Sequence, residues 1–179
     1  YDIQTKGEAL TDDEIHTLFK ARKPGVKLVL ISDSCHSGTV TRAAAAEPEA
    51  DAPRPRFMPM GNWMPDKDLP RSRSGGVASF INIGASTSPF LAAYTRSEDD
   101  LLFSGCQEGP NNFSYDAKIS GRYNGAFTYY ALKTLKTLSA NASYKDWHEA
   151  IRRYLPSASY PQAPQLVGTI TARQMKIFS

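Results

Sequence analysis

The chain has 179 residues and a formal net charge of +3, and hydrophobic residues make up 41% of it. These values are typical of one globular domain with a core of its own. The small charge argues against a nucleic-acid-binding protein, and no apolar stretch reaches the roughly 18 to 20 residues of a membrane-spanning helix. The two cysteines, Cys35 and Cys106, are too few for a secreted disulfide scaffold, so we expect a cytoplasmic protein.

The N-terminal part has the pattern of a helix followed by a buried strand. Residues 10–19 have helical spacing of apolar side chains, with Thr11 as N-cap and Glu14 three positions later, the spacing of a capping box. Pro24 and Gly25 should end this helix. The near-continuous apolar run 26–31 then predicts a buried parallel strand. A helix, a short turn and a buried strand in succession indicate an α/β fold.

The composition changes between residues 41 and 76. This stretch contains half of the 12 prolines of the chain and an alanine run, which makes it a poor core former. We therefore predict an exposed proline-rich loop. Its basic residues are Arg42, Arg54, Arg56, Lys67, Arg71 and Arg73.

Regular structure is predicted again from residue 77. Residues 77–83 alternate weakly, as a strand or the entry to a loop would, and residues 101–106 predict a second buried strand. Residues 111–123 are polar and loop-like.

Two helices and a last strand are predicted for the C-terminal part. Asn124 should cap a helix over 125–138, a second helix should cover 144–155, and a closing strand is expected near 175–178.

Cys35 lies just beyond the predicted strand 26–31, where α/β sheets collect their reactive groups. Asp33 and Cys35 should point the same way, about 6 to 7 Å apart, because side chains alternate along a strand. That distance suits a substrate whose carbonyl carbon lies at Cys35 and whose cationic side chain reaches Asp33. Gly38 permits a tight turn after the thiol. The alternative is a cysteine acting as a small buried hydrophobe, which is our interpretation of Cys106.

The residues around Cys35 carry a family resemblance. Residues 33–38, Asp-Ser-Cys-His-Ser-Gly, resemble the nucleophile motif of the metacaspases and of the bacterial caspase-like peptidases called orthocaspases. Weaker resemblances to the same family occur elsewhere in the chain, in the order that the family has them. One lies before the motif, at residues 1–2 with 11–14, and the others lie after it, at 104–107, 114–117, 124–128 and 160–166.

The resemblance implies a caspase-like three-layer α/β sandwich, with a mostly parallel central sheet and helices on both faces. Residues 1–179 would form one peptidase domain that lacks its N-terminal, histidine-bearing part. Within it, 41–76 would be the exposed loop between subunits and 77–179 the small-subunit-like half.

The resemblance also implies a cysteine endopeptidase that cuts protein substrates after Arg or Lys through a Cys–His dyad. Cys35 matches the nucleophile, and Asp33 matches the carboxylate that binds the basic residue before the cut bond (the P1 residue). Asp116 lies where related peptidases place another such acid. The alternative interpretation is that Asp116 is a solvated loop residue. The loop 41–76 would then offer basic sites for self-processing, unless it is an uncut insertion.

The catalytic histidine is not assigned within the chain. The family carries it upstream of the Asp-Asp segment, and His16, His36 and His148 read as surface residues. We therefore expect the histidine on another segment or another chain. The rival hypothesis is a catalytically inactive caspase-fold module that regulates or scaffolds partners.

Calcium is a second implied feature. Asp12 and Asp13 match carboxylates that bind calcium in type I metacaspases, and hard oxygen ligands suit that ion. A further family ligand is an acid, and Arg42 stands in its place. The alternative is that Asp12 and Asp13 stabilise the start of their helix through its dipole. The chemistry itself needs no cofactor.

Overall fold

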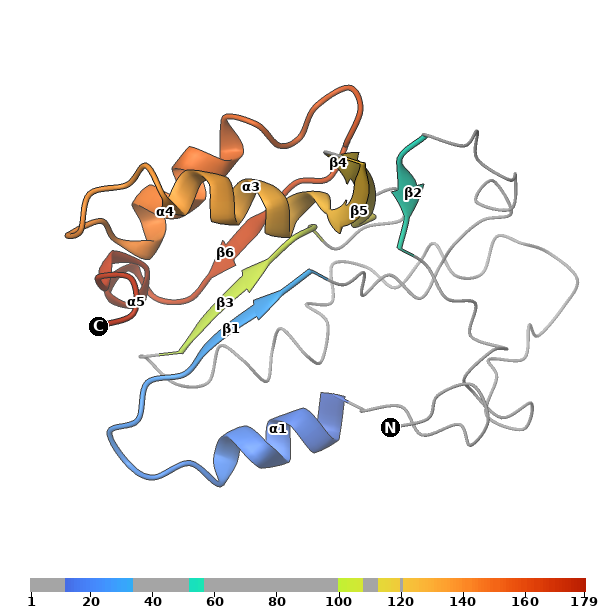
Figure 1. The fold of residues 1–179 in the computed structure, drawn as a ribbon. Coiled ribbons are helices and arrows are strands. Elements are labelled where there is room, and N and C mark those ends of the chain that lie inside the picture. Colours follow the sequence, from blue (N-terminus) through green and yellow to red (C-terminus); the bar gives the residue numbers. More distant parts are fainter. Residues whose placement is uncertain (1–11, 34–51, 57–99, 108–112, 120) are drawn as a thin grey trace, which may run out of the picture. The chain divides into compact units, whose positions relative to one another are not determined.

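The computed structural model describes residues 12–33, 52–56, 100–107, 113–119 and 121–179 (Figure 1). The chain divides into two compact units, one formed by residues 1–24 and 58–93 and the other by residues 25–57 and 94–179. In the first unit, the described residues contain the helix α1, Asp12–Lys20. This helix confirms the prediction for residues 10–19. Thr11, its proposed cap, and residues 77–83 lie outside the described residues.

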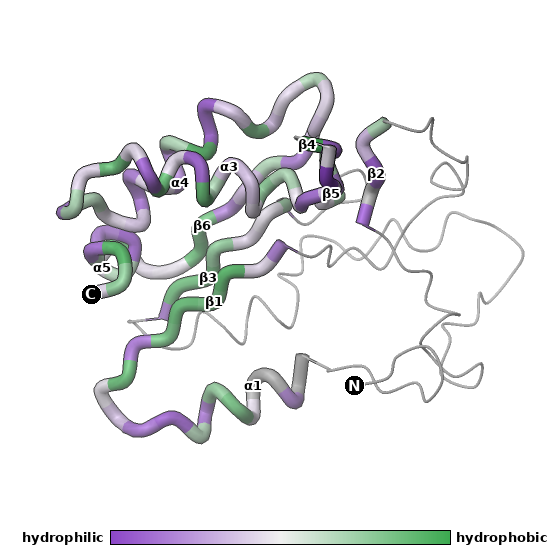
Figure 2. Tube along the Cα trace, viewed as in Figure 1, coloured by the Kyte–Doolittle hydropathy of each residue, from purple (hydrophilic) through white to green (hydrophobic). Residues whose placement is uncertain are grey.

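The second unit is built on a three-stranded sheet. The strands β1, Val29–Ser32, and β3, Leu101–Ser104, are parallel, and β6, Gln165–Val167, runs antiparallel to β3. The two predicted apolar strands are therefore neighbours, and they are hydrophobic stretches in Figure 2. All four residues of β3 are buried. β1 is only half-buried and Ile31 is 41% exposed, since β1 has one strand neighbour, β3, among the described residues.

Helices α3, Ala126–Leu135, and α4, Tyr144–Arg152, pack together against β3. The Phe103 ring lies edge-on to the rings of Phe127 on α3, at 5.2 Å, and Trp147 on α4, at 5.1 Å. The Trp147 indole N–H donates a hydrogen bond of 2.9 Å to the Ala131 carbonyl. Both predicted helices are thus confirmed, and their buried faces form the core of this unit.

The prediction of a loop over 111–123 is wrong. A second sheet occupies this region, with strand order β2-β4-β5 and antiparallel pairing throughout. Its strands are β2, Arg54–Pro55, β4, Tyr115–Ile119, and β5, Arg122–Gly125. The hairpin between β4 and β5 turns at Gly121, whose φ of +79° suits glycine. Ala117 is the one fully buried residue of β4, so the strand carries little of the apolar signal of a core strand.

Two further expectations at the ends of elements are also wrong. Asn124 belongs to β5 and its side chain bonds the Arg122 carbonyl, while Gly125 is the N-cap of α3. Residues 175–178 form no strand beyond a single bridge between Lys176 and Ser143. The last strand is β6, and a short helix, α5, Ile170–Gln174, follows it. Met175 and Ile177 resemble a strand in sequence because their alternate side chains pack on the core.

Among the described residues, no helix has the length and apolar character needed to cross a membrane.

Candidate active site

Asp33 directly follows β1 and is anchored by the first turn of α3. Its Oδ2 atom accepts hydrogen bonds from the backbone N–H of Thr128, at 3.1 Å, and from Thr128 Oγ1, at 2.7 Å. The N-cap residue Gly125 has no side chain to satisfy the first N–H groups of the helix. Asp33 therefore acts as a distant cap, with a negative charge at the positive end of the helix dipole.

Two glycines enclose this carboxylate. A Cβ atom at Gly125 would overlap Asp33 Oδ2, and one at Gly105 would lie 3.0 Å from Asp33 Oδ1. The Asp33 side chain is only 9% exposed. Its Oδ1 atom is buried and accepts no hydrogen bond from the described residues. Asp33 is thus a nearly buried carboxylate with spare acceptor capacity.

Arg56 joins the two acids that the sequence singled out for substrate binding. Its Nε atom donates to Asp116 Oδ1 at 2.6 Å, and its Nη1 atom donates to the backbone carbonyl of Asp33 at 2.7 Å. The same Nη1 lies 3.4 Å from Asp33 Oδ2. The side chains of Arg56 and Asp116 are each 35% exposed. Partial burial and charge-assisted hydrogen bonds make these contacts stronger than those of a fully exposed ion pair.

The backbone around Arg56 lies as a strand beside β4. Arg54 pairs with Asp116, and Pro55 with Tyr115. The Arg56 N–H continues this ladder with a hydrogen bond of 2.7 Å to the Ser114 carbonyl. The Arg54 guanidinium lies over the Tyr123 ring, 4.5 Å from its centroid. A short extended segment is therefore held by both its main chain and its side chains.

Gln162 connects the two walls of this region. It is fully buried. Its Oε1 atom accepts a hydrogen bond of 2.9 Å from the Tyr115 N–H, and its Nε2 atom donates one of 2.9 Å to the Gly105 carbonyl. It thereby ties the edge of β4 to the end of β3. Both its amide groups are used, so a shorter or apolar side chain would leave buried backbone groups unpaired.

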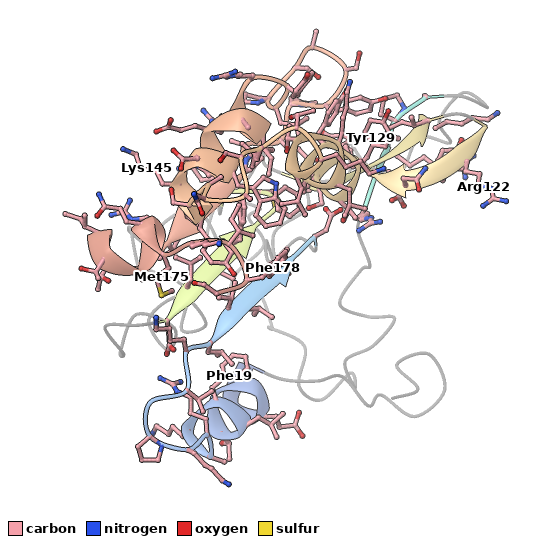
Figure 3. All side chains as sticks on the ribbon, turned by 60° about the vertical axis from the view of Figure 1, so that its left-hand side comes forward. Phe19, Arg122, Tyr129, Lys145, Met175 and Phe178 are labelled. Carbon is pink, nitrogen blue, oxygen red and sulfur yellow. The ribbon has the colours of Figure 1, made fainter. Side chains whose placement is uncertain are left out.

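An open cavity of about 670 Å³ adjoins the Arg56 side chain. Its walls come from the start of α3 and the exposed face of that helix, including Gly125, Thr128 and Lys133. In Figure 3, Tyr129 marks the side of α3 that borders this cavity, and Arg122 projects from the neighbouring hairpin.

The remaining sequence-predicted site residues are placed as follows. Cys35 lies outside the described residues. Asp12 and Asp13 are the first residues of α1, but their side chains, like that of His16, are not described. In the described part of the chain, no three His, Cys, Asp or Glu side chains gather as a metal site. Cys106 is 5% exposed, which confirms its structural interpretation.

His148 is not the surface residue that the sequence suggested. It lies half-buried on α4, with Nε2 2.9 Å from the Pro164 carbonyl oxygen and its ring 5.7 Å from that of Phe103. Burial lowers its pKa below the usual value, and the hydrogen bond to Pro164 opposes this only in part.

Comparison with known proteins decides the family. The profile of the caspase domain matches residues 1–175. The chain belongs to the caspase family. Metacaspase-1 of Candida albicans is 32% identical over an alignment of 182 positions that covers 92% of this chain and 39% of that protein. Metacaspase-1A of Neurospora crassa is 30% identical over an alignment of 185 positions that covers 92% of this chain and 38% of that protein.

The caspase domain therefore has the caspase-like α/β fold, and its resemblance to the metacaspases is confirmed. The chain spans about two fifths of the length of these curated relatives.

The sequence predicted that Asp33 and Asp116 belong to one site, but not which residues surround them. Thr128, Gln162 and the two glycines lie in segments for which the sequence predicted secondary structure or a resemblance, but no role in a site. Arg56 was one of six basic residues in the proline-rich stretch, and nothing in the sequence distinguished it from the others.

Proposed function

We propose that this caspase domain is a cysteine endopeptidase that cuts after Arg or Lys, with Cys35 as the nucleophile. One observation supports it above the others. Asp33 and Asp116, the acids expected to bind a basic P1 side chain, both contact the guanidinium group of Arg56. A planar cation with several donors suits two oxygen acceptors and a backbone carbonyl. A site with this chemistry would select a basic side chain from a substrate in the same way.

The nucleophile is close to this site by covalent connection alone. Cys35 follows Asp33 by two residues, and two residues span at most about 7 Å. A substrate with its basic side chain at Asp33 could thus present its carbonyl carbon to the thiol. The thiolate attacks that carbon, the C–N bond breaks, and the departing amine takes a proton from the histidine. Water then hydrolyses the thioester. The Cys35 N–H and a second amide upstream would stabilise the oxyanion.

The general base is proposed to come from another segment or chain. An unassisted thiol is only a few per cent thiolate at neutral pH, so a histidine partner is needed. The edge of β1 that faces away from β3 supports this part of the proposal. Among the described residues it pairs with β3 alone, and Ile31 is exposed. A further strand carrying the histidine could pair there and bring the base to the end of β1.

No step passes through a metal ion, and Asp12 and Asp13 take no part in the chemistry. We place the activity in a reducing compartment such as the cytoplasm, because it needs a reduced thiol.

The test uses the full-length protein and fluorogenic peptides that differ only at P1. We expect hydrolysis after Arg and Lys, none after Asp, and complete loss in Cys35→Ala. Asp33→Asn should lower kcat/KM for the Arg peptide by about 30-fold or more, because the cationic P1 side chain of the substrate loses the nearly buried carboxylate that it pairs with. Asp116→Asn should have a smaller effect, since its side chain is more exposed.

Glu149→Gln is the matched control. It removes one carboxylate from the exposed surface of α4, where Glu149 lies 3.7 Å from Lys145. Its kinetics should equal those of the wild type. Cleavage after Asp, or activity that survives Cys35→Ala, would refute the proposed function. A stable, folded protein that cuts none of the peptides would instead favour the inactive regulatory module.

A further inference from the structure

We propose that Gln162 is a positioning residue for the P1 site. Its side-chain amide sets the separation of Asp33 and Asp116, and through that separation it favours arginine over lysine as the P1 residue. The inference rests on the proposed function and concerns how the same site distinguishes the two basic side chains. Gln162 itself carries no charge and takes no part in the proposed reaction steps.

One half of the Gln162 amide holds the backbone that encloses Asp33. Gln162 Nε2 donates to the Gly105 carbonyl at 2.9 Å, and the Gly105 N–H donates to the Ser32 carbonyl at 2.7 Å. Both polar groups of Gly105 are therefore held, at the place where a Cβ atom would lie only 3.0 Å from Asp33 Oδ1. The position of the Asp33 carboxylate thus depends on where Gln162 holds this glycine.

The other half of the amide holds β4 at the residue before Asp116. The ladder between β4 and β5 ends with Asp116 opposite Gly125, because the chain enters α3 at Ala126. At the preceding residue of β4, the Tyr115 N–H donates to Gln162 Oε1 at 2.9 Å. The Gln162 side chain thus continues the hydrogen bonding of β4 where β5 has ended, and it fixes the backbone that carries Asp116.

The link through Gln162 has only one orientation. The side chain is fully buried, and both its partners are main-chain groups. If the amide were turned over, its NH₂ group would face the Tyr115 N–H and its oxygen would face the Gly105 carbonyl, so neither hydrogen bond could form. A buried amide with one permitted orientation is a rigid spacer between the two walls of the site.

A fixed separation of the two acids matters more to arginine than to lysine. The guanidinium group has its donors in a rigid planar fork, whereas the lysine ammonium is a compact charge on a flexible stem. The guanidinium of Arg56 shows the bridge that a fork makes, with Nε 2.6 Å from Asp116 Oδ1 and Nη1 3.4 Å from Asp33 Oδ2. An ammonium group needs only one of these carboxylates. A change in their separation should therefore weaken the binding of arginine more than that of lysine.

The experiment uses the full-length protein and two fluorogenic peptides that differ only in Arg or Lys at P1. The ratio of their kcat/KM values is the readout, because the amount of folded enzyme and the titration of the dyad cancel in it. Ionised Gln162→Glu keeps an acceptor for the Tyr115 N–H but has no donor for the Gly105 carbonyl. At about pH 8 its Arg-to-Lys ratio should be about tenfold or more below that of the wild type.

Lowering the pH should rescue Gln162→Glu. Burial raises the pKa of a carboxyl group above its ordinary value of about 4.3, so this side chain should be protonated at about pH 5.5. The protonated carboxyl can again donate to the Gly105 carbonyl, and the Arg-to-Lys ratio should return to that of the wild type. A residue that only supported the fold would give no such recovery of selectivity.

Two further variants serve as controls. Gln162→Met has a similar length but lacks the donor, so its ratio should stay low at both pH values. Gln174→Glu makes the same chemical change at an exposed residue of α5 and should keep the wild-type ratio throughout.

The outcomes separate the inference from the proposed function. The inference is wrong if the wild type cuts both peptides and the Gln162 variants keep its ratio at both pH values. It is also wrong if the ratio of Gln162→Glu stays low as the pH falls, or if both Gln162 variants are unfolded, since the residue would then serve folding alone. In each of these cases the proposed function stands. If the wild type hydrolyses neither peptide, the proposed function fails and the inference with it.

Discussion

At the residue scale, the Asp33 side chain has two roles, and both restrict which residues can lie beside it. Its carboxylate caps α3 through Thr128, and it faces the guanidinium of Arg56. As the cap of α3, Asp33 accepts hydrogen bonds at Oδ2, and these fix the rotation of its carboxylate group. Its Oδ1 atom accepts no hydrogen bond from the described residues and can accept one from another group. The absence of side chains at Gly105 and Gly125 is what lets the group lie this deep. Thr128 is therefore a positioning residue for substrate binding.

Thr128→Val tests this role, because it removes the hydroxyl and keeps both the shape and the backbone N–H. One lost hydrogen bond to a charged group costs about 1.5 to 3 kcal/mol. We expect KM for Arg peptides to rise at least about tenfold with little change in kcat, since the bond orients a binding group. Thr171→Val, at an exposed position of α5, should leave both constants unchanged. Equal losses for Arg peptides and for peptides with a neutral P1 residue would point to general damage instead.

At the scale of elements, apolar strands and amphipathic helices were predictable and the polar strands were not. β3 is buried along its length, so its sequence is almost wholly apolar. β4 has one buried residue and gains its position from pairing with β5 and from Gln162, a residue more than forty positions away. The alternation of Tyr115, Ala117 and Ile119 was the available signal. The charged residues between them gave the same stretch the composition of a loop.

The capping box at the N-terminus of α4 allows a test of stability in a helix whose cap lies outside the hydrogen bonds of the candidate active site. Ser143 and Asp146 form a capping box, with Ser143 Oγ accepting from the Asp146 N–H at 3.2 Å and Asp146 Oδ2 accepting from the Ser143 N–H at 2.8 Å. The Ser143 N–H and the Ser143 hydroxyl, whose Oγ lies 2.7 Å from Asp146 Oδ2, both donate to this carboxylate and lower the pKa of Asp146. Ser143→Ala should reduce the free energy of unfolding by about 1 kcal/mol in urea titrations.

Ser159→Ala serves as the control for this prediction, because Ser159 is exposed in a bend outside the helices. Its free energy of unfolding should stay within about 0.5 kcal/mol of the wild type. Peptide hydrolysis by both variants should match the wild type at temperatures where they are folded. A Ser143→Ala protein as stable as the wild type would mean that water replaces the cap at no cost.

At the scale of the whole molecule, the site is assembled from segments far apart in sequence. The end of β1, residues 54–56, the end of β3, the edge of β4, the start of α3 and the C-terminal segment all contribute. The motif around Cys35 predicted the acid at 33 because both lie on one short stretch. A contact between positions 33, 56 and 116 has no local pattern. It depends on how the strands pair, which a single sequence does not reveal.

His148 connects helix α4 with β3 and with the C-terminal segment, and it makes their packing sensitive to pH. It is on α4, bonds the Pro164 carbonyl in the segment before β6, and packs on Phe103 of β3. Burial is the main cause of its lowered pKa. Arg152 and Arg173 lower the pKa further, while the Pro164 hydrogen bond and Glu149 oppose the shift. The folded protein therefore prefers the neutral ring, whereas the unfolded chain binds a proton near the ordinary pKa of about 6.5.

The sign of the pH effect follows from proton binding. Below about pH 6.5 the unfolded state holds more protons at His148 than the folded state, so stability falls as the pH drops from there toward the lowered folded pKa. Above about pH 7 this residue should contribute no pH dependence. His148→Gln does not titrate, and its amide can still donate to the Pro164 carbonyl. In urea unfolding followed from about pH 7.5 to pH 5, the wild type should therefore lose more stability than the variant. Equal losses would mean that the ring is solvated enough to protonate without disturbing the contact between α4, β3 and the C-terminal segment.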